Sequence, residues 1–256
     1  MYAVNCSILF TELPLLERPA AAKQAGFDAV EFWWPWPVAV PEDAEIDRFA
    51  AAVTDAGVQL IGLNFAAGDM PAGDRGLVSW PARSGEFRDN VDVTVGIGER
   101  LGCRAFNALY GNRVEGVSAA EQDELAAENL AIAARAAKRV EGTVLVEPVS
   151  GAPRYPLRTA ADALAAIDRA GEDNLRLLLD VYHLSVNGDD VDAAIDAGRF
   201  GHVQIADAPG RHQPGTGELP IARWLSKIAA TGYDGRIALE YVPEGPDPFG
   251  WLEGQR

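Results

Sequence analysis

Residues 143–149 read TVLVEPV, a short apolar run with one carboxylate, Glu147, close to its end. The same arrangement recurs three times farther along the chain, in LRLLLDVYH (175–183), FGHVQIAD (200–207) and RIALEYV (236–242). Short apolar runs without alternation are typical of parallel strands that are buried on both faces. A carboxylate or amide inside such a strand is costly unless a partner compensates it. These runs therefore predict four parallel strands, each with a functional group near its end.

Four further apolar runs precede them, at residues 3–9, 29–33, 59–64 and 104–109. Ala-rich amphipathic segments separate the runs and predict helices at 42–56, 86–101, 119–139, 159–170 and 221–230, several of them followed by a glycine that is typical of helix ends: Gly57, Gly102, Gly171 and Gly232. Eight strands alternating with helices favour an α/β fold with a single (β/α)8 TIM barrel. A doubly wound nucleotide-binding sheet is disfavoured because no GxGxxG follows the first strand. We expect one catalytic domain over residues 1–256.

Composition excludes several classes of partner. The 256 residues carry a net charge of -16, which opposes binding to nucleic acid or to an anionic membrane surface. No apolar run reaches the ~18 residues that a membrane span requires, and no basic segment precedes the first apolar run. We therefore expect a soluble, cytoplasmic protein that acts on a small molecule. Cys6 and Cys103 lie apart in apolar runs and predict buried free thiols.

Four oxygen-bearing side chains occupy the ends of the last four predicted strands: Glu147, Asp180, Gln204 and Glu240. The carboxyl ends of barrel strands meet at one mouth, so these groups are expected to surround one point. Three carboxylates and an amide oxygen form a ligand set that suits Mg²⁺ or Mn²⁺. The alternative is that each residue is simply the solvated start of a loop.

Three other residues are candidates for substrate binding. His183 lies three residues after Asp180, in DVYH. Arg211, in the Gly- and Pro-rich loop ADAPGRHQPGTGEL, and Arg75, in the irregular stretch 66–84, could each clamp a carboxylate. Solvated loop arginines are the alternative. The stretch 66–84 is expected to be an ordered functional loop over the mouth, with a surface loop of no functional role as its rival.

The segment EFWWPWP, residues 31–37, places three tryptophans near the end of the second strand. Their rings could wall a small pocket or pack against a neighbouring subunit of a homo-oligomer. Glu31 is a candidate for a hydrogen bond to substrate, with a structural hydrogen bond as the alternative.

Taken together, these motifs resemble a known family. LVEPV, DVYH, HVQIAD followed by PGTGE, LEYVP, AAGD with GDRG after the third strand, and EFWWP are similar to segments of the hydroxypyruvate isomerases, within the xylose-isomerase-like barrel superfamily, and the likeness spans nearly the whole chain. The resemblance implies that Glu147, Asp180, Gln204 and Glu240 bind the metal. It also implies that Glu147 and Glu240 form the acid/base pair, and that His183 and Arg211 contact substrate. Gln204 replaces the histidine of many sugar epimerases of the superfamily, which favours the hydroxypyruvate branch. The motif LNFAAGDM (63–70), where the family resemblance leads us to expect HNLPAGDW, departs from that pattern at four positions, which bears on substrate contact at Asn64 and Met70.

The resulting expectation is a metal-dependent isomerase that interconverts hydroxypyruvate and tartronate semialdehyde through an enediolate, using two glutamates as acid and base. A 2-oxo-tetronate isomerase or a keto-sugar epimerase would use the same site, and an inosose-dehydratase-type lyase is a further alternative. An abasic-site nuclease would need a His-rich site and a basic surface, whereas this chain has three histidines and a net charge of -16. A binding protein without activity would have no need of both glutamates.

Overall fold

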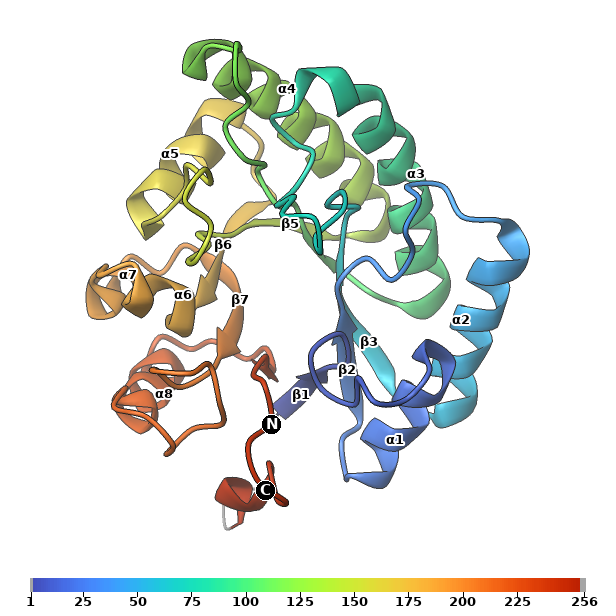
Figure 1. The fold of residues 1–256 in the computed structure, drawn as a ribbon, viewed down its shortest axis with the longest axis vertical. Coiled ribbons are helices and arrows are strands. Elements are labelled where there is room, and N and C mark those ends of the chain that lie inside the picture. Colours follow the sequence, from blue (N-terminus) through green and yellow to red (C-terminus); the bar gives the residue numbers. More distant parts are fainter. Residues whose placement is uncertain (1, 254–256) are drawn as a thin grey trace.

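The computed structural model describes residues 2–253 and contains a closed barrel of eight parallel strands (Figure 1). Each strand pairs with the next along the chain, and β8 closes the barrel on β1. The strands are β1 (Tyr2–Asn5), β2 (Ala29–Phe32), β3 (Gln59–Asn64), β4 (Ala105–Asn107), β5 (Thr143–Val146), β6 (Leu175–Asp180), β7 (Phe200–Ile205) and β8 (Ile237–Leu239). The predicted (β/α)8 barrel is confirmed.

Helices surround the barrel: α1 (Arg18–Gln24), α2 (Asp43–Ala56), α3 (Ser84–Leu101), α4 (Ala119–Ala137), α5 (Ala160–Ala170), α6 (Val181–Val186), α7 (Val191–Asp196) and α8 (Ile221–Ala230). Short 3₁₀ turns occur at Leu15–Glu17, Pro81–Arg83, Lys138–Val140 and Gly250–Leu252. Gly57, Gly102 and Gly171 end their helices in the left-handed conformation, as predicted. Within residues 2–253, no helix is both long and apolar enough to cross a membrane.

Local hydrogen bonds explain where the observed elements differ from the predicted ones. The first apolar run was expected to continue to residue 9, but the strand ends at Asn5, whose side-chain Oδ1 accepts the backbone N–H of Ser7 at 2.9 Å. This turn competes with strand pairing. The helix predicted at 119–139 is α4, and it ends at Ala137 because the next three residues form a 3₁₀ turn. α1, α6 and α7 were not predicted, since six or seven residues are too few for a clear helical period.

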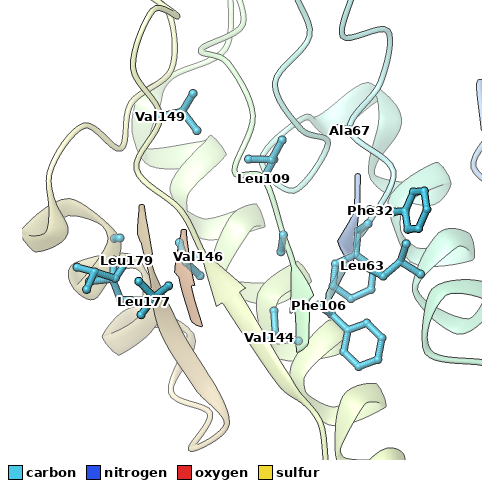
Figure 2. Packing of buried hydrophobic residues seen from close by; sticks show 14 of the residues in the cluster. Phe32, Leu63, Ala67, Phe106, Leu109, Val144, Val146, Val149, Leu177 and Leu179 are labelled. Carbon is cyan, nitrogen blue, oxygen red and sulfur yellow. The ribbon is translucent and has the colours of Figure 1, made fainter. Parts of the chain in front are cut away.

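The apolar core lies between the strands and the helices (Figure 2). Side chains alternate along a strand, so Phe32 faces outward and packs edge-on against Phe49 of α2, with ring centroids 5.1 Å apart, while its neighbour Glu31 lies on the opposite face of β2. Cys6 and Cys103 are buried free thiols, and burial raises the pKa of both to about 12. The alternation leaves polar side chains in the barrel interior, beneath its mouth.

Candidate active site

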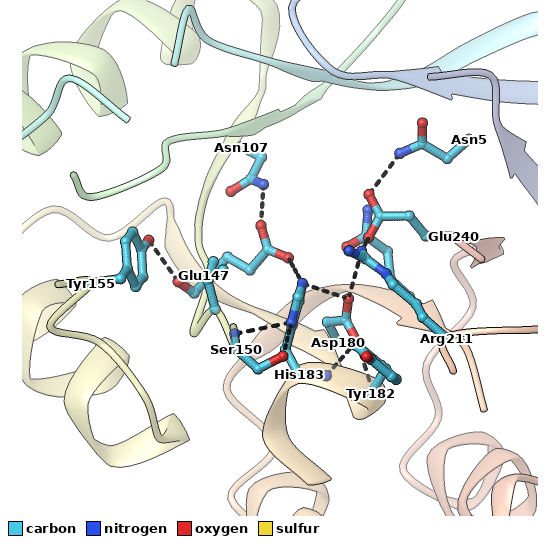
Figure 3. Close-up of polar contacts among 12 residues, drawn as sticks. Asn5, Asn107, Glu147, Ser150, Tyr155, Asp180, Tyr182, His183, Arg211 and Glu240 are labelled. Atoms are coloured by element: carbon cyan, nitrogen blue, oxygen red, sulfur yellow. Dashed lines mark hydrogen bonds and ion pairs between the residues drawn. The ribbon is translucent and has the colours of Figure 1, made fainter. Parts of the chain in front are cut away.

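Glu147, Asp180 and Glu240 converge at the carboxyl ends of their strands (Figure 3). Glu147 follows β5, Asp180 is the last residue of β6, and Glu240 follows β8. His183, three residues after Asp180 on α6, lies beside them. One carboxylate oxygen from each of the three residues and one ring nitrogen of His183 lie within 4.8 Å of one another. All four residues are buried. The predicted convergence of the strand ends is therefore observed for the three carboxylates.

The carboxylate of Glu147 is held on one side only. The Asn107 amide donates to its Oε2 at 2.6 Å, and the Tyr155 hydroxyl donates to its backbone carbonyl at 2.9 Å. Burial raises the pKa of Glu147 to about 8, and the nearby charge of Asp180 adds to the shift.

Glu240 accepts three hydrogen bonds. Its Oε1 accepts from Asn5 at 2.9 Å and from the Trp33 indole at 2.5 Å, and its Oε2 accepts from Arg211 at 2.8 Å. Burial raises the pKa of Glu240 well above its ordinary value, against the opposing charge of Arg211. The Glu240 carboxylate is thus held by the end of β1, by the residue that follows β2 and by the loop that follows β7.

The hydrogen bonds of His183 decide which ring nitrogen carries the proton. The backbone N–H of Ser150 donates to Nδ1 at 3.0 Å, so Nδ1 must present a lone pair. The Ser150 hydroxyl lies 2.7 Å from the same nitrogen. In the neutral ring Nε2 therefore carries the hydrogen, and burial lowers the pKa of His183 to about 4. Nε2 lies 3.7 Å from Asp180 Oδ2 and 3.9 Å from Glu147 Oε1, where it can donate a hydrogen bond to a bound molecule rather than ligate a cation.

Gln204, on β7, is the fourth predicted metal ligand. Its amide nitrogen donates to Glu31 at 2.6 Å, and its Oε1 is buried without a hydrogen-bond partner among the described residues. A buried amide oxygen of this kind normally has a partner. The three carboxylates are hard oxygen donors of the kind that a divalent cation prefers, and Gln204 pairs with Asp180 between neighbouring strands. Metal binding by these residues stays a prediction.

Both predicted arginines line the cavity above these groups. Arg211 has a left-handed backbone (φ 59°), and its guanidinium lies 5.3 Å from the centre of the Tyr182 ring and 4.0 Å from Asp180. Arg75 donates to the backbone carbonyls of Met70 at 3.0 Å and Asp74 at 2.6 Å. Contact of either guanidinium with substrate stays a prediction.

The cavity has a volume of about 330 Å³ and includes Glu147, His183, Arg211 and Glu240 in its wall. A second cavity of about 580 Å³ adjoins it, and Trp33, Asn64, Met70 and Pro71 line both. Trp34 and Trp36 line the second cavity, with ring centroids 4.8 Å apart. The tryptophans of residues 31–37 thus wall a pocket.

Two comparisons define the relationship of the chain. The model of the xylose isomerase-like TIM barrel family matches residues 19–256. A Streptomyces coelicolor protein named "Putative hydroxypyruvate isomerase" is 55% identical over 98% of this chain and 95% of the relative. The chain belongs to the hydroxypyruvate isomerase family of xylose isomerase-like TIM barrels. It is an enzyme of the isomerase class.

Other similar proteins carry several different names. The hydroxypyruvate isomerase of Escherichia coli K12 is 32% identical, with 100% of this chain and 99% of the relative covered. A 2-oxo-tetronate isomerase of Cupriavidus necator is 33% identical, with 98% and 97% covered. A Brucella melitensis crystal structure described as an AP endonuclease of family 2 superimposes with a TM-score of 0.90 at 34% identity, covering 100% of this chain and 98% of the other.

Within this family member, the structure places Glu31 differently from the other predicted site residues. It is buried and accepts hydrogen bonds from Asn5, His202 and Gln204, and it is not among the residues that line the cavity of about 330 Å³. Direct contact of Glu31 with substrate stays a prediction.

Sequence reasoning missed several polar residues of the site. Asn5 and Asn107 end β1 and β4 in the same way that Asp180 ends β6, so the strand-end rule could have found them. Ser150 had no such signal, because its role depends on a backbone position in three dimensions. Trp33 was expected as a pocket wall, but not as a hydrogen-bond donor to Glu240.

Proposed function

We propose that this isomerase interconverts hydroxypyruvate and tartronate semialdehyde (2-hydroxy-3-oxopropanoate) through an enediolate. The observation that carries the proposal is the pair of buried glutamates, Glu147 from β5 and Glu240 from β8, that lie in the wall of one cavity together with Arg211. Proton transfer between adjacent carbons needs an acid and a base that reach the same small substrate. The names of the curated relatives support this substrate.

In the proposed reaction one glutamate removes a proton from the hydroxyl-bearing carbon, and the other assists delivery of a proton to the former carbonyl carbon. The hydroxyl proton moves to the neighbouring oxygen, so hydroxypyruvate and its product have the same atoms. Arg211 pairs with the substrate carboxylate, and the N–H at His183 Nε2 donates to a substrate oxygen.

Glu147, Asp180, Gln204 and Glu240 would hold a divalent cation, Mg²⁺ or Mn²⁺. When bound, the cation would polarise the carbonyl and hydroxyl oxygens and so favour loss of the carbon-bound proton. Support comes from the three carboxylates and from the Gln204 oxygen, which has no hydrogen-bond partner within residues 2–253.

A four-carbon substrate is the second candidate, because the adjoining cavity offers room beyond a three-carbon acid. The Cupriavidus necator relative is named for such a substrate. A nuclease activity has less support, since a net charge of -16 opposes binding to DNA.

Comparing kcat/KM for hydroxypyruvate, a 2-oxo-tetronate and a neutral ketohexose tests the proposal. The highest value is expected for hydroxypyruvate. A clear preference for the ketohexose would overturn the substrate and the role of Arg211 as a carboxylate clamp.

A further inference from the structure

Glu31 is a buried carboxylate that the proposed reaction does not use. Three donors converge on it: the Gln204 amide at 2.6 Å and the Asn5 amide at 2.9 Å on Oε1, and His202 Nε2 at 2.6 Å on Oε2. These donors come from β7 and β1, which are not neighbours in the barrel. One side chain therefore ties together two walls of the barrel below the active site.

The contact with Gln204 has a chemical consequence. A carboxylate accepts hydrogen bonds, so the NH₂ end of the Gln204 amide must face Glu31. The oxygen end is then the one that has no hydrogen-bond partner in the described part of the chain. If the amide were turned over, its oxygen would meet Glu31 Oε1 and two acceptors would be in contact. Glu31 thus selects one of the two orientations of the amide.

Gly62 leaves room for the Glu31 side chain. A Cβ at Gly62, on the neighbouring strand β3, would lie 3.1 Å from Glu31 Oε2 and 3.2 Å from its Cβ. A larger residue at position 62 would therefore be in close contact with the Glu31 side chain and would displace its carboxylate. Asn5 further couples Glu31 to the catalytic carboxylate, because its amide also donates to Glu240 Oε1.

We propose that Glu31 is a positioning residue that orients the Gln204 amide so that its oxygen is presented to a divalent cation. The inference rests on the cation of the proposed function. This role does not involve contact between Glu31 and substrate. It depends on an acceptor oxygen lying within hydrogen-bond distance of the Gln204 amide, and not on the negative charge of Glu31. Residues that orient metal ligands in this way typically change metal affinity by about 10- to 100-fold when they are altered.

Two substitutions distinguish the position of the Glu31 acceptor oxygen from the charge of its carboxylate. Glu31→Asp keeps the charge but withdraws the acceptor from Gln204 by one methylene. Glu31→Gln loses the charge but keeps an oxygen within reach of Gln204 and Asn5, with its NH₂ turned toward His202, whose Nε2 can accept in the other tautomer. Orientation by Glu31 predicts that Glu31→Asp binds Mn²⁺ about 10- to 100-fold more weakly than the wild type, and that Glu31→Gln stays close to it. A role through charge predicts the reverse order.

The experiment is calorimetric titration of Mn²⁺ into full-length protein after chelation and desalting. Gln204→Met and the double variant Glu31→Asp/Gln204→Met complete a cycle, in which Glu31→Asp should have no further effect once the amide is gone. Gln122→Met, which removes a buried amide bonded to the Ser79 and Asn112 carbonyls, is the control for general loosening and should leave the Mn²⁺ affinity unchanged.

The outcomes separate this inference from the proposed function. Equal weakening by Glu31→Asp in both backgrounds, or weaker binding by Glu31→Gln than by Glu31→Asp, overturns the role of Glu31 while the metal site stands. If one of the two variants does not fold, the comparison of the other with the wild type still decides between the position of the acceptor oxygen and the charge. A wild-type protein that binds neither Mn²⁺ nor Mg²⁺ would overturn both the metal site and this inference.

Discussion

Replacing Glu147 by Gln removes one titrating group with little change of shape. The new amide can keep an oxygen toward the active site if its NH₂ faces Asn107. Asn107 can accommodate this by turning over its own amide, because its Oδ1 is buried and has no hydrogen-bond partner among the described residues. We therefore expect Glu147→Gln to fold and to lose turnover by ~10²- to 10⁴-fold, the usual contribution of general acid–base catalysis.

The same substitution should change how stability depends on pH in chelator-treated protein. Burial raises the pKa of Glu147 from 4.5 to about 8, so between these values the unfolded chain ionises this group while the folded chain retains its proton. The contribution of Glu147 to stability is thus complete below pH 4.5 and declines as the pH rises toward 8, by up to about 1.4 kcal/mol per pH unit. Glu147→Gln should remove this decline.

Urea unfolding at pH 5, 6, 7 and 8, with chelator present, measures the difference between the two proteins. Because all other titrating groups are shared, their contributions largely cancel in this difference. The variant should gain stability over the wild type as the pH rises. A difference that stays constant across this range would refute the assignment of a buried, proton-retaining carboxyl to Glu147.

Three further predictions concern the ligands and the cavity. Chelation should abolish turnover and Mg²⁺ or Mn²⁺ should restore it, and Gln204→His should shift the preference toward softer ions such as Co²⁺ or Zn²⁺; full activity without metal, or an unchanged metal ranking, would speak against this ligand set. His183→Gln should reduce kcat/KM but leave Mn²⁺ affinity nearly unchanged, because Nε2 carries a hydrogen, and a large loss of affinity would instead make His183 a ligand. Met70→Trp should narrow the passage between the two cavities and lower kcat/KM for a 2-oxo-tetronate at least ~10-fold more than for hydroxypyruvate, whereas Met70→Leu, the volume-matched control, should leave the ratio unchanged. An equal loss for both substrates would show that the second cavity takes no part in substrate choice.

The architecture could be predicted because its signals are local. Eight apolar runs and the glycines that close the helices were sufficient to indicate the barrel, and the strand-end rule found Glu147, Asp180 and Glu240. The short helix α6 escaped detection, although it places His183 beside the carboxylates.

The finer chemistry of the site depends on contacts between residues far apart in the sequence. Glu31 meets Gln204 and His202 only when the barrel closes, and Trp33 reaches Glu240 across the junction of the first and last strands. The proton position on His183 likewise follows from one backbone N–H, at Ser150. No periodicity or motif carries such information.

The central claim is proton transfer between adjacent carbons by the two glutamates, and hydroxypyruvate turnover in D₂O tests it most directly. Followed by NMR, the wild-type reaction should place deuterium on the carbon that becomes the CHOH of tartronate semialdehyde, provided that the glutamate proton exchanges with solvent. Glu147→Gln and Glu240→Gln should not catalyse this incorporation. Incorporation of deuterium that persists at the wild-type rate in either variant would contradict the account.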